Sequence, residues 1–309
     1  MKYKTIFMGT PEFSIPSLQT VFDMTDLTAI FTQPDKKRGR GQKLSASPVK
    51  TFGLEKNIDV HQPNKMKESI DVIKNLEPDL IIVVAYGKIL PQSILEIPRF
   101  GCINVHASLL PRYRGAAPMQ WTLINGETYT GVTTMKMDVG LDTGDILLQR
   151  EIGIEPEMNF EQLHDVLKIE GAICLKDTLE NFESIKPRKQ DDRESNYSPM
   201  ITKEIQRINW KKSAWEIHNL VRAMDSHPGS ITTFKHADGR IETLKIWKTR
   251  VVDNEIPNEC PGDILKLENL SIAASSGVVQ ILELQAQNGK RMSAENFLRG
   301  HDLSGGKFE

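Results

Sequence analysis

The sequence predicts an α/β protein in which a doubly wound, Rossmann-like parallel sheet is followed by a smaller, OB-like β-barrel domain. Strand-like and helix-like segments alternate through the first half, which is typical of a parallel sheet with helices on both faces. Short strand-like runs separated by Gly, Pro and Asn follow later, as in a small barrel. The 309 residues exceed the length of about 250 residues at which a single core stops growing, so we expect two domains.

Each element of the first half is predicted from its hydrophobic periodicity. Short apolar runs indicate strands, and apolar residues recurring at every third or fourth position indicate helices. The predicted strands are 5–8, 27–31, 79–85, 101–106, 132–137 and 146–148, and the predicted helices are 14–22, 49–56, 67–76, 115–125 and 160–182. Residues 79–85 are apolar on both faces, as a buried parallel strand should be.

A polar stretch after Ile185 divides the chain, because it is nearly free of apolar residues, as a solvated linker should be. We predict a first domain over residues 1–189, a linker over 190–205 and a second domain over 206–309. In the second domain the patterns predict a helix at 214–223 and strands at 231–234, 244–249, 262–267, 270–274 and 278–284. Five short strands suit an OB-type barrel.

Composition excludes some classes of protein and indicates a compartment. The 39 Lys and Arg residues against 41 Asp and Glu residues give a net charge of −2, which leaves only local basic patches for binding a polyanion. Cys102, Cys174 and Cys260 are too few and too far apart for a disulfide framework or a zinc cluster. The sequence shows no signal-peptide core and no membrane-length apolar run. We expect a cytoplasmic protein.

Two glycine-containing turns fail to match common nucleotide-binding motifs. The turn at 9–13 lacks the G-x-G-x-x-G spacing that brings backbone against a pyrophosphate, which disfavours a nicotinamide cofactor. Residues 39–45 superficially suggest a phosphate loop but do not read G-x-x-x-x-G-K-[ST]. Neither a dinucleotide nor a P-loop nucleotide is therefore predicted.

Polar side chains gather at the end of one predicted strand. Period-two alternation places Asn104 and His106 on one face of strand 101–106, at the carboxyl end where open α/β sheets place their sites. Asp142 lies in a Gly-flanked loop between two later strands. Taken alone, Asn104 and His106 more often cap backbone groups, and Asp-Thr-Gly is ordinary turn chemistry. From these residues alone, a functional site and a set of ordinary capping and turn residues both remain open as interpretations.

One segment is strongly basic. Residues 32–50 contain six basic side chains against Asp35 alone, a net of +5; the six are Lys36, Lys37, Arg38, Arg40, Lys43 and Lys50. Such a run is usually a solvated face. Gly39 and Gly41 add backbone freedom, so a loop that orders around phosphates is the alternative hypothesis.

Longer motifs resemble a known family. Residues 104–115 read Asn-x-His-x-Ser-Leu-Leu-Pro-x-Tyr-Arg-Gly and are followed by Asp-Thr-Gly-Asp at 142–145, which resembles the signature of 10-formyltetrahydrofolate-dependent formyltransferases. Further stretches are similar to the members of that family that act on methionyl-tRNA, namely 7–13, 32–35, 39–43, 47–50, 83–87, 115–118, 203–204, 207–210 and 217–223. The sequence departs at Tyr113, where Trp is common, and at 225–228, where an aromatic residue usually precedes Pro.

The resemblance implies a reaction and a catalytic trio of Asn104, His106 and Asp142. The co-substrate is 10-formyltetrahydrofolate, and the acceptor is the α-amino group of methionine on initiator tRNA. Stabilising the tetrahedral intermediate is the harder task, because negative charge gathers on the formyl oxygen. Asn104 and His106 are expected to donate to that oxygen, while Asp142 holds His106 and helps to remove the amine proton. The trio needs no metal.

Binding residues are also implied by the resemblance. Folate is expected at Phe13, Val84, Ala85, Tyr86, Gly87, Ser108, Leu109, Leu110 and Pro111. The tRNA acceptor stem is expected at Lys36, Lys37, Arg38, Arg40, Gly41, Lys43, Lys211 and Lys248, with the protein acting as a monomer.

Two rival functions remain at this point. A formyltransferase acting on a small amine, such as a sugar nucleotide or glycinamide ribonucleotide, would share the trio without needing the basic segment or a second domain. An inactive RNA-binding protein on an α/β scaffold would keep the basic residues without the trio.

Overall fold

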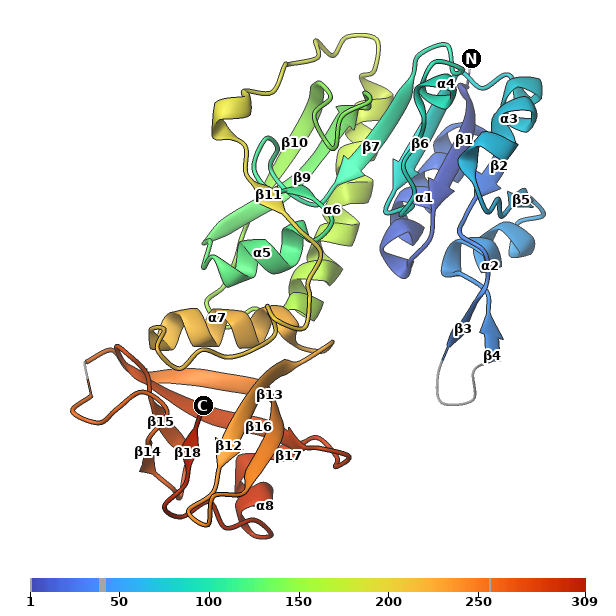
Figure 1. The fold of residues 1–309 in the computed structure, drawn as a ribbon. Helices are drawn as coiled ribbons and strands as arrows, with labels where there is room; N and C mark the ends of the chain where they lie inside the picture. Colours follow the sequence, from blue (N-terminus) through green and yellow to red (C-terminus); the bar gives the residue numbers. More distant parts are fainter. Residues whose placement is uncertain (1, 39–42, 256) are drawn as a thin grey trace. The chain divides into compact units, whose positions relative to one another are not determined.

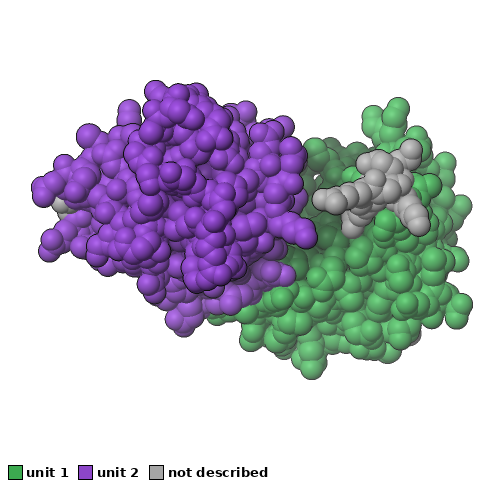
Figure 2. All heavy atoms as spheres, turned by 90° about the horizontal axis from the view of Figure 1, so that it is seen from below, with its two compact units in different colours: residues 1–115, 129–152, 164–198 green, residues 116–128, 153–163, 199–309 purple. Residues whose placement is uncertain are grey.

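The computed structural model describes residues 2–38, 43–255 and 257–309 (Figure 1). The chain folds into two compact units, each assembled from three stretches of sequence (Figure 2). Unit 1 contains residues 1–115, 129–152 and 164–198, and unit 2 contains residues 116–128, 153–163 and 199–309. A single cut in the sequence does not separate these units, and the predicted domain limits at 189 and 205 stay a prediction. Within the described ranges, no helix is long and apolar enough to cross a membrane.

Unit 1 is built on a seven-stranded sheet with the order β10-β9-β7-β6-β1-β2-β5. Its strands are β1 (Lys4–Gly9), β2 (Asp26–Phe31), β5 (Asp59–His61), β6 (Leu80–Val84), β7 (Cys102–His106), β9 (Tyr129–Lys136) and β10 (Ile146–Gly153). The five strands from β5 to β7 pair in parallel, and β9 pairs antiparallel with β7. The predicted Rossmann-like α/β fold is confirmed. The antiparallel direction of β9 is not predicted by the sequence, because a hydrophobic pattern does not reveal in which direction a strand runs.

Helices connect the strands of this sheet (Figure 1). The connecting helices are α1 (Ile15–Met24), α2 (Pro48–Glu55), α3 (Ile70–Leu76) and α4 (Gln92–Leu95), and α6 (Phe160–Glu180) follows the last strand, β10. The first turn of α6 belongs to unit 2. Local chemistry sets where α2 begins: Ser47 accepts a hydrogen bond from the Lys50 N–H, and Pro48 occupies the first helical position, where its missing N–H costs nothing.

One face of the sheet carries a continuous apolar core. Alternate residues of β1, β2 and β6 are wholly or almost wholly buried on this face together with residues of α3 and α4, among them Ile6, Met8, Phe31, Ile81, Val83, Ile73 and Ile94. This packing leaves the carboxyl ends of the strands, and the loops that follow them, as the place where polar groups accumulate.

Unit 2 contains a nearly closed antiparallel barrel, which confirms the OB-like prediction. Its strands are β12 (Ser230–Lys235), β13 (Ile241–Asp253), β14 (Ile264–Lys266), β15 (Ser271–Ala273), β16 (Val278–Ala286), β17 (Met292–Ser293) and β18 (Lys307–Phe308). They follow the order β14-β15-β16-β13-β12-β18, with β17 on β16. A bridge between Asp263 and Lys307 brings the two ends of this order together. The strands β17 and β18 are too short to produce a hydrophobic period.

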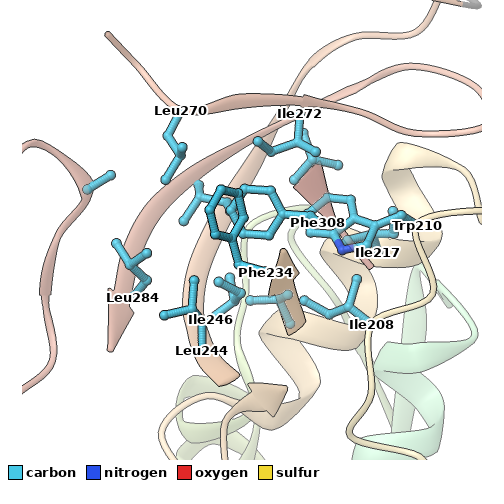
Figure 3. Close-up of a cluster of buried hydrophobic side chains, with 14 of the residues drawn as sticks. Ile208, Trp210, Ile217, Phe234, Leu244, Ile246, Leu270, Ile272, Leu284 and Phe308 are labelled. Carbon is cyan, nitrogen blue, oxygen red and sulfur yellow. The ribbon is translucent and has the colours of Figure 1, made fainter. Parts of the chain in front are cut away.

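The barrel core is apolar and includes a helix. Figure 3 shows Phe234, Ile246 and Phe308 directed at one another, with Ile217 of α7 (Ala214–Met224) beside them. Trp210 closes this cluster and satisfies its buried indole by donating to the Thr232 hydroxyl at 2.9 Å. The other helices of unit 2 are α5 (Pro118–Ile124) and α8 (Ala294–Leu298).

Candidate active site

The three predicted catalytic residues meet at the carboxyl end of β7. Asn104 and His106 belong to this strand, and Asp142 lies in the loop between β9 and β10. Asn104 Nδ2 is 3.5 Å from one carboxylate oxygen of Asp142, and His106 Nδ1 is 3.7 Å from the other. The carboxylate therefore faces both partners, one with each oxygen.

His106 is held by its second ring nitrogen. The side chain is only 7% exposed, and Nε2 lies 2.9 Å from the carbonyl oxygen of Tyr113. Because a carbonyl oxygen can only accept, we infer that Nε2 carries the hydrogen in this contact. Nδ1 is then the ring nitrogen that faces Asp142.

The backbone of Asp142 occupies the left-handed region, with φ at 54°. Asp tolerates this region better than most residues with a Cβ atom, since its short side chain can form local hydrogen bonds. The Gly115 N–H donates to the carboxylate at 2.9 Å, and the Gln190 side chain donates to the Asp142 carbonyl at 2.8 Å. Asp142 is thus both a turn residue and an aimed carboxylate.

Gly115 can be only a glycine at this position. Its φ is +115°, and a Cβ atom would lie 2.8 Å from the Ser198 carbonyl oxygen and 2.6 Å from the Tyr197 ring. Any side chain would push residues 114–115 away from residues 197–198, with which they pair, and would withdraw the N–H from which the Asp142 carboxylate accepts a hydrogen bond. The glycine therefore supports the site through its backbone.

The predicted folate residues divide by exposure. The side chains of Val84, Tyr86, Ser108 and Leu110 are buried within unit 1, whereas Ala85 and Gly87 are exposed. Phe13 and Pro111 are also buried, and Leu109 is partly buried. A buried side chain contacts other protein groups, so a ligand at this edge would meet Ala85, Gly87 and backbone atoms first.

Buried polar groups in this region are already satisfied by the protein. The Ser108 hydroxyl donates to the Arg112 carbonyl at 2.7 Å, and the Tyr86 hydroxyl lies 3.0 Å from the Met66 sulfur. Burial raises the pKa of Tyr86 to about 12, so its hydroxyl keeps its proton at neutral pH. The folate assignment remains a prediction.

The loops after β1, β2 and β6 are tied together near Gly87. The Thr10 hydroxyl donates to the Tyr86 carbonyl at 3.0 Å, and the Gln33 side chain donates to the carbonyls of Tyr86 and Gly87 at 3.0 and 3.1 Å. Sequence reasoning did not single out Gln33. Its contact with a segment more than fifty positions later arises only once the strands are paired.

The basic segment forms a hairpin in the described residues. Strand β3 (Lys36–Arg38) pairs antiparallel with β4 (Lys43–Ser45), while Arg40 and Gly41 lie outside the described residues. Lys36 is exposed and donates to the Gln33 side chain at 2.7 Å. The two remaining predicted tRNA residues, Lys211 and Lys248, are exposed in unit 2.

One basic side chain of this segment is already neutralised. Lys50 pairs with Asp35 at 2.7 Å, and the hydrogen bond from Lys50 is the main cause that lowers the pKa of Asp35 below its usual value. Lys50 is therefore already paired within the protein.

Three side chains elsewhere in unit 1 have ligand atoms close enough for a metal ion. They are Glu12, His164 and Asp165, whose ligand atoms lie within 4.8 Å of one another. The Lys168 ammonium is 2.9 Å from Glu12 and 2.8 Å from Asp165, so it already balances both carboxylates. This group is accounted for as a surface ion-pair network.

The two departures from the family pattern have different consequences. Tyr113 contacts His106 through its backbone carbonyl oxygen, which a residue with any side chain would supply. Asp225 accepts hydrogen bonds from Asn159 at 3.0 Å and from Arg291 at 2.8 Å, all within unit 2. The first departure leaves the backbone contact intact, and the second places a paired carboxylate in the C-terminal part.

Comparison with known families agrees with this architecture. Residues 16–179 match the family model described as formyl transferase, and residues 200–302 match the formyl transferase C-terminal domain. Together with the Rossmann-like sheet and the barrel, these matches define the class of protein, an enzyme that transfers formyl groups.

Curated relatives show to which family of formyltransferases the chain belongs. A methionyl-tRNA formyltransferase of Caldanaerobacter subterraneus subsp. tengcongensis is 48% identical over 98% of both chains. Those of Clostridium novyi and Clostridium perfringens are each 46% identical, over 97% of both chains and over 98% of this chain and 99% of the relative, respectively. The chain belongs to the methionyl-tRNA formyltransferase family.

Solved structures show the same fold at lower identity. WlaRD, a sugar 3N-formyl transferase, aligns with a TM-score of 0.69 and 24% identity over 94% of this chain and all of its own. HypX from Aquifex aeolicus in complex with tetrahydrofolic acid aligns with a TM-score of 0.62 and 19% identity, over 99% of this chain and 48% of HypX. These likenesses show the fold alone.

Proposed function

We propose that this protein transfers the formyl group of 10-formyltetrahydrofolate to the α-amino group of methionyl initiator tRNA. The observation that supports this most strongly is the 46–48% identity to methionyl-tRNA formyltransferases across nearly the whole of both chains. The small-amine alternative is not favoured, because the sugar N-formyltransferase WlaRD is only 24% identical.

Asn104 and His106 stabilise the developing oxyanion in this proposal. The Asn104 amide has two hydrogens, of which one faces Asp142 and the other is free to point at the formyl oxygen. His106 presents Nδ1 on the same side, since Nε2 is occupied by the Tyr113 carbonyl, and the protonated form of the ring donates from Nδ1 to the developing oxyanion. Donors placed in advance where negative charge develops are usually the largest single contribution to catalysis of acyl transfer.

Asp142 orients His106 and assists removal of the proton from the attacking amine. An amine attacks in its unprotonated form, and an α-amino group has a reference pKa of about 7.7–8.0, so a substantial neutral fraction exists near neutrality. Strong activation of the nucleophile is therefore unnecessary. None of these steps calls on a metal ion.

The folate is proposed to lie along the sheet edge formed after β6 and β7. These strands are paired neighbours, so the exposed Ala85 and Gly87 and the segment 108–111 follow adjacent carboxyl ends. Phe13 follows the next strand, β1, which pairs with β6. The apolar residues of these segments suit the ring system of the folate.

The tRNA is proposed to meet the β3–β4 hairpin and the exposed Lys211 and Lys248 through phosphate contacts at the acceptor stem. Such contacts position a nucleic acid without reading its sequence. We further propose that the protein acts as a monomer in the cytoplasm, in line with its three free cysteines.

A direct assay tests this function. Purified protein is incubated with 10-formyltetrahydrofolate and methionyl initiator tRNA, and N-formylmethionine is measured after deacylation. Parallel reactions offer a dTDP-amino sugar and glycinamide ribonucleotide as acceptors. We expect product on the tRNA alone. Formylation of a small amine without formylation of the tRNA would contradict the proposal.

A further inference from the structure

We propose that Gln190 is a positioning residue for the transfer reaction, because it holds the loop that presents Asp142. The inference rests on the proposed function of the trio. Gln190 is the first residue of the segment that the sequence predicts to be a solvated linker, so nothing in its composition marks it as part of a site.

The Gln190 side chain uses both ends of its amide. Nε2 donates to the carbonyl oxygens of Asp142 at 2.8 Å and Gly144 at 2.7 Å. Oε1 accepts from Arg114 Nε at 3.0 Å. Both amide hydrogens and one acceptor position are thus used, and this geometry fixes the orientation of the side chain.

These contacts close a ring around the carboxylate. Gln190 fixes the backbone of Asp142, and it also fixes Arg114, the residue directly before Gly115. Gly115 in turn donates its N–H to the Asp142 carboxylate at 2.9 Å. One side chain therefore sets the separation of the carboxylate from its backbone donor, and with it the aim of Asp142 at His106.

The rest of the same segment holds the partner of His106. The Asn196 side chain accepts from the Tyr113 N–H. The Ser198 hydroxyl lies 2.8 Å from the Arg114 carbonyl and 3.2 Å from the Tyr113 carbonyl, which also contacts His106. Strand β11 (Tyr197–Ser198) pairs in parallel with β8 (Arg114–Gly115). The segment 190–198 thus fixes the loop 113–115 at both of its catalytic contacts.

Two substitutions separate the parts of this role. Gln190→Ala removes all three hydrogen bonds, and Gln190→Glu keeps the volume and the acceptor for Arg114 while removing the donors to the two carbonyls. Arg193→Ala is the matched control, since Arg193 lies in the same segment, is exposed, and pairs with Asp191. Thermal unfolding of each variant establishes that it is folded at the assay temperature.

We expect Gln190→Ala and Gln190→Glu to lower kcat about 10- to 100-fold, because misplacement of a catalytic group by about 1 Å can cost 10²-fold in rate. The Michaelis constant for methionyl-tRNA should change by less than about twofold, as the contacts lie behind Asp142 and not at a binding surface. Arg193→Ala should retain wild-type kcat. A folded Gln190→Glu variant with wild-type kcat would overturn the proposal, as would a lowered melting temperature without loss of turnover.

A second readout does not depend on activity. The Gly115 amide proton is hydrogen-bonded to a carboxylate, so its NMR resonance, observed with selectively ¹⁵N-labelled glycine, reports that contact. The resonance should move in both Gln190 variants and stay in place in Arg193→Ala. If wild-type protein fails to formylate tRNA, the proposed function falls, while the Gly115 resonance still decides whether Gln190 positions Asp142. An unmoved resonance in the two Gln190 variants would overturn the inference.

Discussion

The candidate active site of unit 1 and the barrel core of unit 2 are held together by different interactions. Around the site, Ala85, Tyr113 and Asp142 all have φ in the left-handed region, at 47°, 60° and 54°. In the barrel core, Phe234 and Ile246 lie on strands and are fully buried. Groups for chemistry are thus held by hydrogen bonds from irregular loops, and stability comes from apolar packing. Substitutions should therefore separate activity from stability.

The largest loss of stability should follow Phe234→Ala in unit 2. Phe234 is fully buried, and its ring centroid lies 4.9 Å from that of Phe308 (Figure 3). The centroid of the His236 ring lies 4.8 Å away. Truncating a buried Phe leaves a cavity and lowers the free energy of unfolding by about 3–5 kcal/mol. Urea denaturation measures this change. At a temperature where the variant stays folded, its kcat should remain near that of the wild type.

A matched control for this prediction lies on the neighbouring strand. Ile241 of β13 is 63% exposed, so Ile241→Ala should alter the free energy of unfolding by less than about 0.5 kcal/mol. Equal losses for Phe234→Ala and Ile241→Ala would break the comparison, since burial would then not distinguish the two positions.

Asn104→Ala in unit 1 should lower kcat and leave the free energy of unfolding nearly unchanged, which is the reverse of Phe234→Ala. Loss of one oxyanion donor costs about 2.7–4 kcal/mol of transition-state stabilisation, which is a fall of about two to three orders of magnitude in kcat. Asn104 is only part-buried and makes a long contact of 3.5 Å to Asp142, so the free energy of unfolding should change little. Steady-state kinetics and urea denaturation of the same preparation measure both quantities.

Asn181→Ala is the control for this variant, because Asn181 is an exposed residue of unit 1 whose amide donates to the Asp177 carbonyl. It should retain wild-type turnover. Near-wild-type kcat for Asn104→Ala would remove Asn104 from the mechanism and leave it as a strand residue with a local polar contact.

The sequence predicts the three residues of the trio, but it does not predict the residue that holds Asp142 in place. Alternation along one strand places Asn104 and His106 on a common face, and the loop carboxylate of Asp142 follows from the family resemblance. Gln190 escapes this reasoning, because a residue in a polar run is indistinguishable from a solvated one until the chain has folded back on residues 142–144. The pairing of β9 is hidden for a related reason, since strand direction depends on the path between strands.

The sequence also does not show which charges of the basic segment are paired. Counting residues gives six positive side chains, yet Lys50 is held by Asp35, fifteen positions earlier. Composition records how many charges a segment has, and only the packing of α2 against the preceding loop records which of them are already paired. The hairpin strands β3 and β4 also replace the predicted loop at their described residues.

Substitutions in the β3–β4 hairpin and its turn test whether the positive charges of this segment contribute to tRNA binding and not to folding stability. We expect the combined replacement of Lys36, Lys37, Arg38 and Arg40 by Gln to weaken tRNA binding and to leave stability and folate binding unchanged. Each lost phosphate contact should reduce the slope of log K against log salt by about 0.7–0.9. Titration of initiator tRNA over a salt series measures this slope.

A charge-matched control removes four exposed lysines elsewhere in unit 1, namely Lys56, Lys67, Lys74 and Lys176. It should change the salt slope far less than the hairpin variant. Equal slopes for both variants would mean that only the net charge matters and that the hairpin is a solvated face. That result would favour a small amine as the substrate.

The smallest effect is expected at the first turn of α7 in unit 2, where a charge serves stability alone. Glu216 accepts hydrogen bonds from Lys212 at 2.9 Å and from the Ser213 N–H and hydroxyl at 3.0 and 2.8 Å. These bonds, that of Lys212 foremost, lower the pKa of Glu216 to about 2. Because the side chain is half-exposed, solvent screening reduces the contribution to about 1 kcal/mol or less.

The pH dependence of this contribution has a definite sign. The folded-state pKa lies below the value of 4.5 for a free Glu side chain, so the unfolded chain binds the proton more readily. The stabilisation is complete above about pH 4.5 and is lost as pH falls towards about 2. In Glu216→Gln the difference from wild type in urea denaturation should therefore shrink from pH 7 to pH 3, with kcat at neutral pH unchanged. Glu295→Gln, which breaks only an exposed pair with Arg299, should show no such trend. A difference for Glu216→Gln that stays constant with pH would mean that the helix cap acts through its shape and not through its charge.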